Sequence, residues 1–379
     1  MRSVRLILAV ESSCDESAVA LVRDDGAVLA ERIASQSDLH AATGGVVPEV
    51  AAREHHRWVP LLIDEVIAEA ATAGVDREIG AVAVTCGPGL VGSLLVGAGV
   101  ASAWAWARGL PIVPTNHLEG HFRAAWLHGP DESGASTPTL PAIGLIVSGG
   151  HTLLVRVDAD GSVLRLGGTI DDAAGEAFDK IARLLGIPYP GGAALSALAA
   201  RAAGQGDLPD GLRALPVART SGEYDLSFSG VKTAAVRMAL AAIGEPAATP
   251  GRAAVLAATL RDRPVPADAA ATIAAAAEAA IVRAIVARVE RALIATPGAS
   301  LVVGGGVAAN LPLRTALAEV AARHRRSLNI PIARWCTDNA AMIGAAAHAA
   351  LRDGRASLQD PALGVNVSAS WAFGAERPA

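Results

Sequence analysis

Two segments of the chain repeat one order of apolar and polar positions. Each begins with an apolar strand that runs into a short polar loop. Each continues with two further strands joined by an Asp/Gly turn, which is typical of a hairpin. The strands are predicted at residues 4–10, 18–22 and 27–33 in the first segment and at 143–147, 153–157 and 163–166 in the second. The repeated order indicates a duplicated unit.

Each copy continues with a helical stretch, then a strand, a glycine-rich turn and another helix. The strands are predicted at residues 81–84 and 301–303, and the turns are Cys-Gly-Pro-Gly at 86–89 and three glycines at 304–306. This alternation predicts an α/β fold with two lobes and a central cleft. The polar loops after the first strands would face each other across that cleft, where open α/β sheets bind their ligands.

The domain boundaries follow from the repeat. Residues 129–141 are rich in Gly, Pro, Ser and Thr, which is typical of a linker. We expect a first α/β lobe at 1–130, a second at 141–335, and a C-terminal helix and tail at 336–379 that pack back on the cleft and the first lobe. The second lobe should contain a long alanine-rich helix at 266–294. The Pro/Ala-rich stretch 242–266 is expected to be a surface loop.

Residues 79–107 carry no charged side chain, so a membrane-spanning helix has to be considered. The turn at 86–89 would break such a helix, and a buried strand, a turn and a buried helix fit the pattern better. The N-terminal apolar run stops at Glu11 and is too short for a secretion signal. Three scattered cysteines fit a reducing compartment. We therefore expect a cytoplasmic protein that does not use a membrane.

His117 and His121 are four residues apart in Asn-His-Leu-Glu-Gly-His. If this stretch is helical, both imidazoles lie on one face and can bind one divalent metal ion, although exposed histidine pairs at this spacing are common. Glu119 does not match the His-Glu-x-x-His pattern of zinc proteases, so a third ligand is needed. Asp338, before a predicted helix at 340–351, is either that ligand or a helix cap. Two histidines and one carboxylate suit Fe²⁺.

Two glycine-rich turns can bring backbone N–H groups close to an anion. Ser148-Gly149-Gly150-His151 lies between two predicted strands, where an ordinary tight hairpin is the alternative. The glycines at 304–306 open a predicted helix, and Asn310, one turn later, can contact a ribose or a phosphate. If residues 171–180 are helical, Asp172, Glu176 and Asp179 share one face, which is either solvated or turned toward metal, hydroxyls or cations.

Together these motifs resemble the bacterial tRNA N6-adenosine threonylcarbamoyltransferase family, formerly called the glycoprotease or O-sialoglycoprotein endopeptidase family. They follow the family's order along nearly the whole chain. Beside the His pair, Val-Ser-Gly-Gly-His-Thr and Cys-Thr-Asp-Asn, the resemblance rests on Glu-Ser-Ser-Cys-Asp-Glu-Ser at 11–17, Gly-Gly-Val-Val-Pro-Glu at 44–49, Gly-Pro-Gly-Leu-Val-Gly at 87–92, Asp-Asp-Ala-Ala-Gly-Glu-Ala-Phe-Asp-Lys at 171–180 and Ser-Phe-Ser-Gly-Val-Lys-Thr at 227–233.

The resemblance implies an actin-like fold of the sugar kinase and Hsp70 type, and it implies a reaction. Threonylcarbamoyl-adenylate would donate its threonylcarbamoyl group to N6 of adenosine 37 in tRNAs that read ANN codons, and AMP would leave. His117, His121 and Asp338 would bind one metal ion per subunit, expected to be Fe²⁺, with Zn²⁺ or Mg²⁺ as alternatives. The residues assigned in this way to the adenylate are Ile146, Val147, Ser148, Gly149, Gly150, Asp179, Gly192 and Asn310.

A general base for the exocyclic amine is not apparent, and Asp15 and Glu16 of the first polar loop are the candidates. With a net charge of −5, the chain alone should bind tRNA poorly. The resemblance implies two partners, a smaller paralogous subunit and a P-loop ATPase. The apolar helix at 92–107 is the expected face for the paralogue, through Leu94, Val96, Trp104 and Trp106. A metalloprotease and an actin-like ATP-dependent kinase or switch remain as alternative functions.

Overall fold

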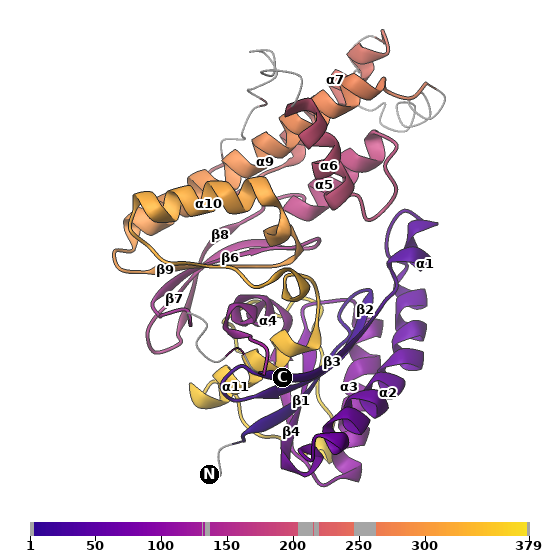
Figure 1. Cartoon of the computed structure of the whole chain (residues 1–379), viewed down its shortest axis with the longest axis vertical. Helices are drawn as coiled ribbons and strands as arrows, with labels where there is room; N and C mark the ends of the chain where they lie inside the picture. Colours follow the sequence, from indigo (N-terminus) through magenta and orange to yellow (C-terminus); the bar gives the residue numbers. More distant parts are fainter. Residues whose placement is uncertain are drawn as a thin grey trace.

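The computed structural model describes residues 4–130, 132, 137–203, 215, 220–245 and 263–376. Two five-stranded sheets, ordered β3-β2-β1-β4-β5 and β8-β7-β6-β9-β10, form the two lobes stacked in Figure 1. In each sheet the first three strands form an antiparallel meander, and the last two add in parallel, so the predicted repeat is confirmed. The strands are β1 Leu6–Glu11, β2 Glu16–Arg23, β3 Val28–Ser35, β4 Ile79–Gly87, β5 Ile112–Asn116, β6 Ala142–Val147, β7 Thr152–Val157, β8 Val163–Gly168, β9 Ser300–Gly304 and β10 Leu328–Asn329.

Helices cover both sheets. The α-helices are α1 Ser37–Ala41, α2 Pro48–Thr72, α3 Val91–Ala107, α4 His117–Arg123, α5 Ala174–Leu184, α6 Gly192–Ala203, α7 Ser229–Ala242, α9 Ala267–Ala295, α10 Leu311–Arg323 and α11 Ala340–Arg352. Short 3-10 turns lie at Asp76–Glu78, Ala124–Trp126, Gly306–Ala309, Ala333–Trp335 and Pro361–Leu363.

The first sheet is covered on both faces, as the alternation along β1 requires. Leu6 and Leu8 pack on one face with α2 and α3, whereas Ile7 and Ala9 pack on the other face with α11. Every side chain of β1 is therefore buried, which explains its continuous apolar run. Helix α11, which follows the second sheet in the chain, thus lies against the first sheet (Figure 1).

The second sheet packs against helices α5, α6, α7, α9 and α10 on one face. Helix α9 is the one helix, among the described residues, that is long and apolar enough to cross a membrane, and 61% of its most apolar window is buried in the protein. Its alanine and isoleucine side chains fill the core of this lobe. Residues 79–107, the other stretch considered for a membrane, form β4, a turn and α3 as predicted.

Helix α4 lies between the two lobes (Figure 1). Leu118 and Phe122 pack with the second sheet. The opposite side of α4 approaches α11 so closely that a Cβ on Gly120 would lie 2.9 Å from the side chain of Ile343. A larger residue would push the helices apart, so Gly120 allows α11 and the residues just before it to reach α4.

One sequence expectation about loops needs correction, and a second is tested only at its ends. The glycines at 304–306 do not open an α-helix: β9 ends at Gly304, a 3-10 turn follows, and α10 begins only at Leu311. Gly305 has a φ of 98°, and a Cβ there would lie 2.3 Å from the carbonyl oxygen of Val147, so the glycine serves this close approach. Of the predicted surface loop 242–266, helix α7 contains residue 242, and residues 246–262 lie outside the described part of the chain.

Candidate active site

His117, His121 and Asp338 come together where α4 meets the segment before α11. Their ligand atoms all lie within 4.8 Å of one another. His117 Nε2 is 3.7 Å and His121 Nε2 is 3.2 Å from Asp338 Oδ1. The helix predicted for the His pair is confirmed, and the Asn116 side chain caps it by accepting from the backbone N–H groups of residues 118 and 119. Asp338 is not a helix cap, because Asn339 caps α11.

Glu11 holds His117 from behind. The carboxylate is fully buried at the end of β1 and lies 3.0 Å from His117 Nδ1. It also accepts from the Thr85 hydroxyl at 2.6 Å and from the backbone N–H of Ser13. A carboxylate on Nδ1 keeps the proton there and leaves the Nε2 lone pair free for a metal ion. The sequence analysis missed Glu11; the signal was a charged residue that ends an otherwise apolar strand.

Two features of these residues fit a metal ion. Both ring nitrogens of His121 are buried and lack a well-oriented hydrogen bond among the described residues: Nε2 faces Asp338 Oδ1 at 3.2 Å, and Nδ1 has no partner. Burying such nitrogens is costly unless something else binds them. Burial opposes charge on His117, but the charges of Glu11 and Asp338 raise its pKa to about 9. Burial likewise opposes charge on Asp338, yet the two histidines hold its pKa well below its usual range. A divalent cation would replace the proton that these carboxylates attract.

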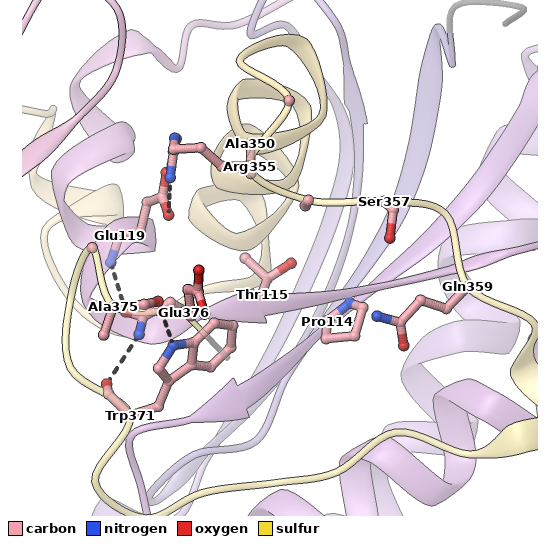
Figure 2. Close-up of a pocket in the computed structure, with 14 residues that line it drawn as sticks. Pro114, Thr115, Glu119, Ala350, Arg355, Ser357, Gln359, Trp371, Ala375 and Glu376 are labelled. Carbon is pink, nitrogen blue, oxygen red and sulfur yellow. Dashed lines mark hydrogen bonds and ion pairs between the residues drawn. The ribbon is translucent and has the colours of Figure 1, made fainter. Parts of the chain in front are cut away.

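Glu119 faces Arg355 and not the metal-ligand candidates; the pair is drawn in Figure 2. Glu119 is buried on the rear of α4 and forms a two-pronged ion pair with Arg355, at 2.5 and 3.0 Å. The same side of α4 is held by the C-terminal segment, because Asn116 Nδ2 donates to the Trp371 carbonyl at 3.0 Å. These residues line a pocket of about 400 Å³ that lies apart from the three metal-ligand candidates. Glu119 is therefore not placed to act as a protease base.

A cleft of about 740 Å³ lies between the lobes and includes His117 and Asp338 in its lining. It continues into a second pocket of about 500 Å³ in the second lobe, and the two share Gly149, Asp179, Pro190, Gly306 and Thr337. The second pocket is mostly apolar and has the size of a small-molecule site. The candidate metal cluster thus opens into a cavity with room for a nucleoside.

The loop after β6 forms one wall of both cavities. Ser148, Gly149 and Gly150 line the cleft, and a Cβ on either glycine would meet no other atom within 4 Å. The loop is closed by Ser148, whose N–H donates to the His151 carbonyl. Ile146 and Val147, in contrast, lie in β6 with their side chains in the core, so they can meet a ligand only through the backbone.

Asp179, Gly192 and Asn310 all line the second pocket. One oxygen of Asp179 accepts from the backbone N–H groups of Gly191 and Gly192, at 2.8 and 3.2 Å, and so shapes the turn that ends the pocket. The amide of Asn310 is committed: its oxygen caps α10, and its nitrogen donates to Ser196 at 2.9 Å and to Glu278 at 2.7 Å. The expected ribose or phosphate contact from this amide therefore needs a rearrangement.

The acidic motif is not one helical face. Helix α5 begins at Ala174, so Asp172 lies before it and accepts from Lys180 and Lys232, at 2.6 Å each. Glu176 also pairs with Lys180, at 2.8 Å. Asp172 and Glu176 are thus neutralised by lysines, and Asp179 is the member of the motif that lines both cavities.

Asp15 and Glu16 line the cleft on the side of the first lobe, next to Ser13 and Cys14. Burial, together with the charges of Asp338 and Asp15, raises the pKa of Glu16 to about 9. Glu16 is therefore protonated at neutral pH without a metal, and its Oε1 accepts from the Ser35 hydroxyl at 3.1 Å. His151 also lines the cleft; burial and the neighbouring histidines lower its pKa to about 4, so it is neutral.

Comparisons with known proteins agree with these features. The model of the tRNA N6-adenosine threonylcarbamoyltransferase family matches residues 27–345. The protein of that name from Bordetella avium is 44% identical over 368 residues, which cover 97% of each chain. The one from Thermomicrobium roseum is 44% identical over 363 residues, 93% of this chain and 94% of the relative.

Among solved structures, T. kodakarensis HypF superposes with a TM-score of 0.55 at 14% identity, over 92% of this chain and 48% of that one. At this identity the likeness concerns the fold alone. The predicted fold class is confirmed: the chain has an actin-like, duplicated α/β fold. Because the family model spans most of the sequence and relatives 44% identical match 97% of it, this chain belongs to the tRNA N6-adenosine threonylcarbamoyltransferase family.

Proposed function

We propose that this chain transfers the threonylcarbamoyl group of threonylcarbamoyl-adenylate to N6 of adenosine 37 in tRNAs that read ANN codons, with release of AMP. Family membership supports the reaction. The structural observation that carries the proposal is the continuity between the pocket in the second lobe and the His-His-Asp cluster, because a donor with a nucleoside at one end and a reactive anhydride at the other needs both.

The donor lies with its adenosine in the second-lobe pocket and its phosphate at the Ser148–Gly150 loop. A Cβ on Gly149 or Gly150 would point into open space, so no side chain of these two residues stands between an anion and the loop. Gly192 and Asp179 form the far wall. In this orientation the carbamoyl group points from the second lobe into the cleft, toward His117 and Asp338.

His117, His121 and Asp338 would hold one metal ion, for which we propose Fe²⁺, with Zn²⁺ and Mg²⁺ as alternatives. Such an ion supplies a positive charge and a Lewis acid for the phosphate or the carbamoyl oxygen when it is bound. Glu11 would support this site, because its contact with Nδ1 fixes the orientation of the His117 ring and keeps the proton on Nδ1.

The chemical step needs little from the protein beyond placement, because the carbamoyl–phosphate anhydride is already activated. The N6 amine attacks the carbamoyl carbon, a C–N bond forms, the C–O bond to phosphate breaks, and AMP leaves with the electron pair. The amine loses one proton, for which we propose Asp15 as acceptor. Glu16, whose pKa burial and the charges of Asp338 and Asp15 raise to about 9 in the metal-free protein, lies beside Asp15 in the cleft lining. A base of this kind contributes about 10²–10⁴-fold.

The test is a reconstituted reaction. Purified protein is loaded with Fe²⁺ and mixed with threonylcarbamoyl-adenylate, tRNA and the candidate partners, and the nucleosides are analysed by mass spectrometry. We expect threonylcarbamoyl-adenosine with the wild-type chain and none with His121→Ala. Turnover of the donor to AMP without modified nucleoside, in the presence of all partners, would contradict the proposal.

The two alternative functions are not favoured. A metalloprotease needs a free glutamate beside the metal, and Glu119 is paired with Arg355 on the other side of α4. An ATP-driven kinase or switch shares the fold but gives no reason for a His-His-Asp cluster at the cleft. Phosphate transfer from ATP by the metal-free protein would favour the kinase instead.

We also propose that the chain works in the cytoplasm with tRNA, a smaller paralogous subunit and a P-loop ATPase. The expected paralogue surface needs one correction, because Leu94 is fully buried and Trp104 is half-buried with Arg108 stacked on its ring at 3.9 Å. An apolar strip on α3 is exposed instead, formed by Val91 at 49%, Leu95 at 55% and Trp106 at 66% exposure. These residues lie one and three turns apart on one helix face, as a docking helix requires.

A further inference from the structure

The loop between β1 and β2 carries the first lobe's contribution to the cleft. Ser13, Cys14, Asp15 and Glu16 all line the cavity. The Ser13 hydroxyl lies 3.1 Å from Nδ1 of His117, and Asp15 is the residue that we assign as base. A shift of this loop would therefore move both a support of a metal-ligand candidate and the base.

His55 of α2 holds this loop from the interior. The side chain is completely buried, and both of its ring nitrogens are engaged. Nε2 lies 2.9 Å from the carbonyl oxygen of Cys14, and Nδ1 lies 2.7 Å from the hydroxyl of Ser17, at the start of β2. A carbonyl can only accept, so Nε2 donates to Cys14 and Nδ1 accepts from Ser17.

This arrangement requires one protonation state. Burial lowers the pKa of His55, which keeps the ring neutral with its single proton on Nε2. The Ser17 hydroxyl selects that tautomer by donating to Nδ1. The ring thus joins two points of the chain, the loop at Cys14 and the strand at Ser17, to a long helix. The proposed mechanism gives His55 no chemical role of its own.

We propose that His55 is a positioning residue for the transfer reaction, which holds the Ser13–Asp15 loop in its active geometry through the hydrogen bond to the Cys14 carbonyl. Its effect on catalysis rests on the proposed function, but its effect on the loop does not. The loop has further anchors on either side of Cys14: Leu90 N–H donates to the Ser13 carbonyl at 2.8 Å, and Gln36 N–H donates to the Asp15 carbonyl at 3.0 Å. Ser13 also contacts Glu11 through its N–H and His117 through its hydroxyl. Without His55 the Cys14 carbonyl between these anchors loses its buried donor.

Cys14 itself provides the assay. It is the one cysteine of three that is partly exposed, because Cys86 and Cys336 are both enclosed in the core. Burial also raises the pKa of the Cys14 thiol, so it reacts slowly while the loop is closed. The rate of thiol labelling at Cys14 under native conditions, measured by mass spectrometry, reports opening of the loop. Labelling of the other two cysteines reports global unfolding.

Three variants separate the two hydrogen bonds. In His55→Gln the amide nitrogen takes the place of Nε2 and keeps the hydrogen bond to the Cys14 carbonyl. In His55→Asn the shorter side chain keeps a partner for the Ser17 hydroxyl but loses the hydrogen bond to the Cys14 carbonyl. His55→Leu loses both. We expect Cys14 to be labelled about tenfold faster in the His55→Asn and His55→Leu variants than in wild type, which corresponds to about 1.4 kcal/mol in the free energy of loop opening. In the His55→Gln variant, Cys14 should be labelled near the wild-type rate. Protection of Cys86 and Cys336 in all three shows that the variants are folded.

The kinetic measurement uses the same variants in the reconstituted reaction. The Asn and Leu variants should lose kcat with an unchanged dissociation constant for the metal, and Gln should restore most of it. Equal Cys14 labelling in Asn and Gln would overturn the proposal, and so would faster labelling in Asn with wild-type kcat. If the wild-type chain itself transfers nothing, the proposed function fails, and the labelling series still decides whether His55 holds the loop.

Discussion

Replacing Glu11 by glutamine tests the support of the metal-ligand candidates without removing a ligand. The change keeps the shape of a side chain that is completely buried, but it replaces one oxygen by an NH₂ group. Three donors surround the native carboxylate: His117 Nδ1, the Thr85 hydroxyl and the Ser13 N–H. A single amide oxygen cannot accept from all of them.

The consequence for the histidine can be worked out from these contacts. If the amide oxygen stays with the Ser13 N–H, the NH₂ group faces Thr85 and His117. The threonine hydroxyl can rotate and accept, but the imidazole can accept only by moving its proton from Nδ1 to Nε2. Nε2 is the nitrogen that faces Asp338, so the lone pair for the metal is lost. Changes of this kind cost about 10–100-fold in metal affinity, or about 1.4–2.8 kcal/mol.

The assay is competitive metal titration against a chelator, monitored for Glu11→Gln and wild type at pH 7.5. Glu16→Gln is the matched control, because Glu16 is a half-buried carboxyl at the other end of the same loop, protonated at neutral pH in the metal-free protein and not bonded to His117. We expect a weaker dissociation constant for Glu11→Gln and an unchanged one for the control. A folded Glu11→Gln protein with wild-type affinity would refute the role of this carboxylate.

Four further outcomes are expected. His121→Ala should lose bound metal and transferase activity while keeping its thermal transition, and retention of full metal occupancy would show that the cluster is not the site. Gly150→Val should weaken binding of a non-hydrolysable adenylate analogue by about tenfold or more. The free energy of unfolding should change by less than about 0.5 kcal/mol, because the new Cβ enters open space. Unchanged affinity for the analogue would show that the loop is not part of the donor site. Without metal, neighbouring carboxylates raise the pKa of His117 from 6.5 to about 9 despite its burial. The contribution of His117 to stability is therefore full below pH 6.5 and lost as pH rises through 9. Denaturation of the apo-protein at several pH values checks this, and the loss should vanish in the metal-loaded form. Leu95→Asp should weaken paralogue binding by more than about 1 kcal/mol, measured by calorimetry, whereas Ile294→Asp, at 61% exposure in the other lobe, should not.

The sequence by itself determined the repeated architecture and the local geometry of the motifs. The continuous apolar run of β1 and the glycine turns after β4 and β9 are short-range features of the sequence, so they can be recognised without the structure. The same is true of the His pair, because a helix one turn long places residues 117 and 121 together whatever surrounds it. The family resemblance supplied Asp338, which spacing alone left as either a ligand or a cap.

Only the tertiary structure decided which distant groups meet and how each helix is turned about its own axis. The rotation of α4 between the lobes sends Glu119 to Arg355 and both histidines to Asp338. The rotation of α3 buries Leu94 and exposes Leu95, although the two are neighbours in the chain. Glu11 and His55 gained their roles from partners far away in sequence. Such pairings depend on close packing of whole elements, where a few ångströms decide which atoms touch, and no local pattern encodes them.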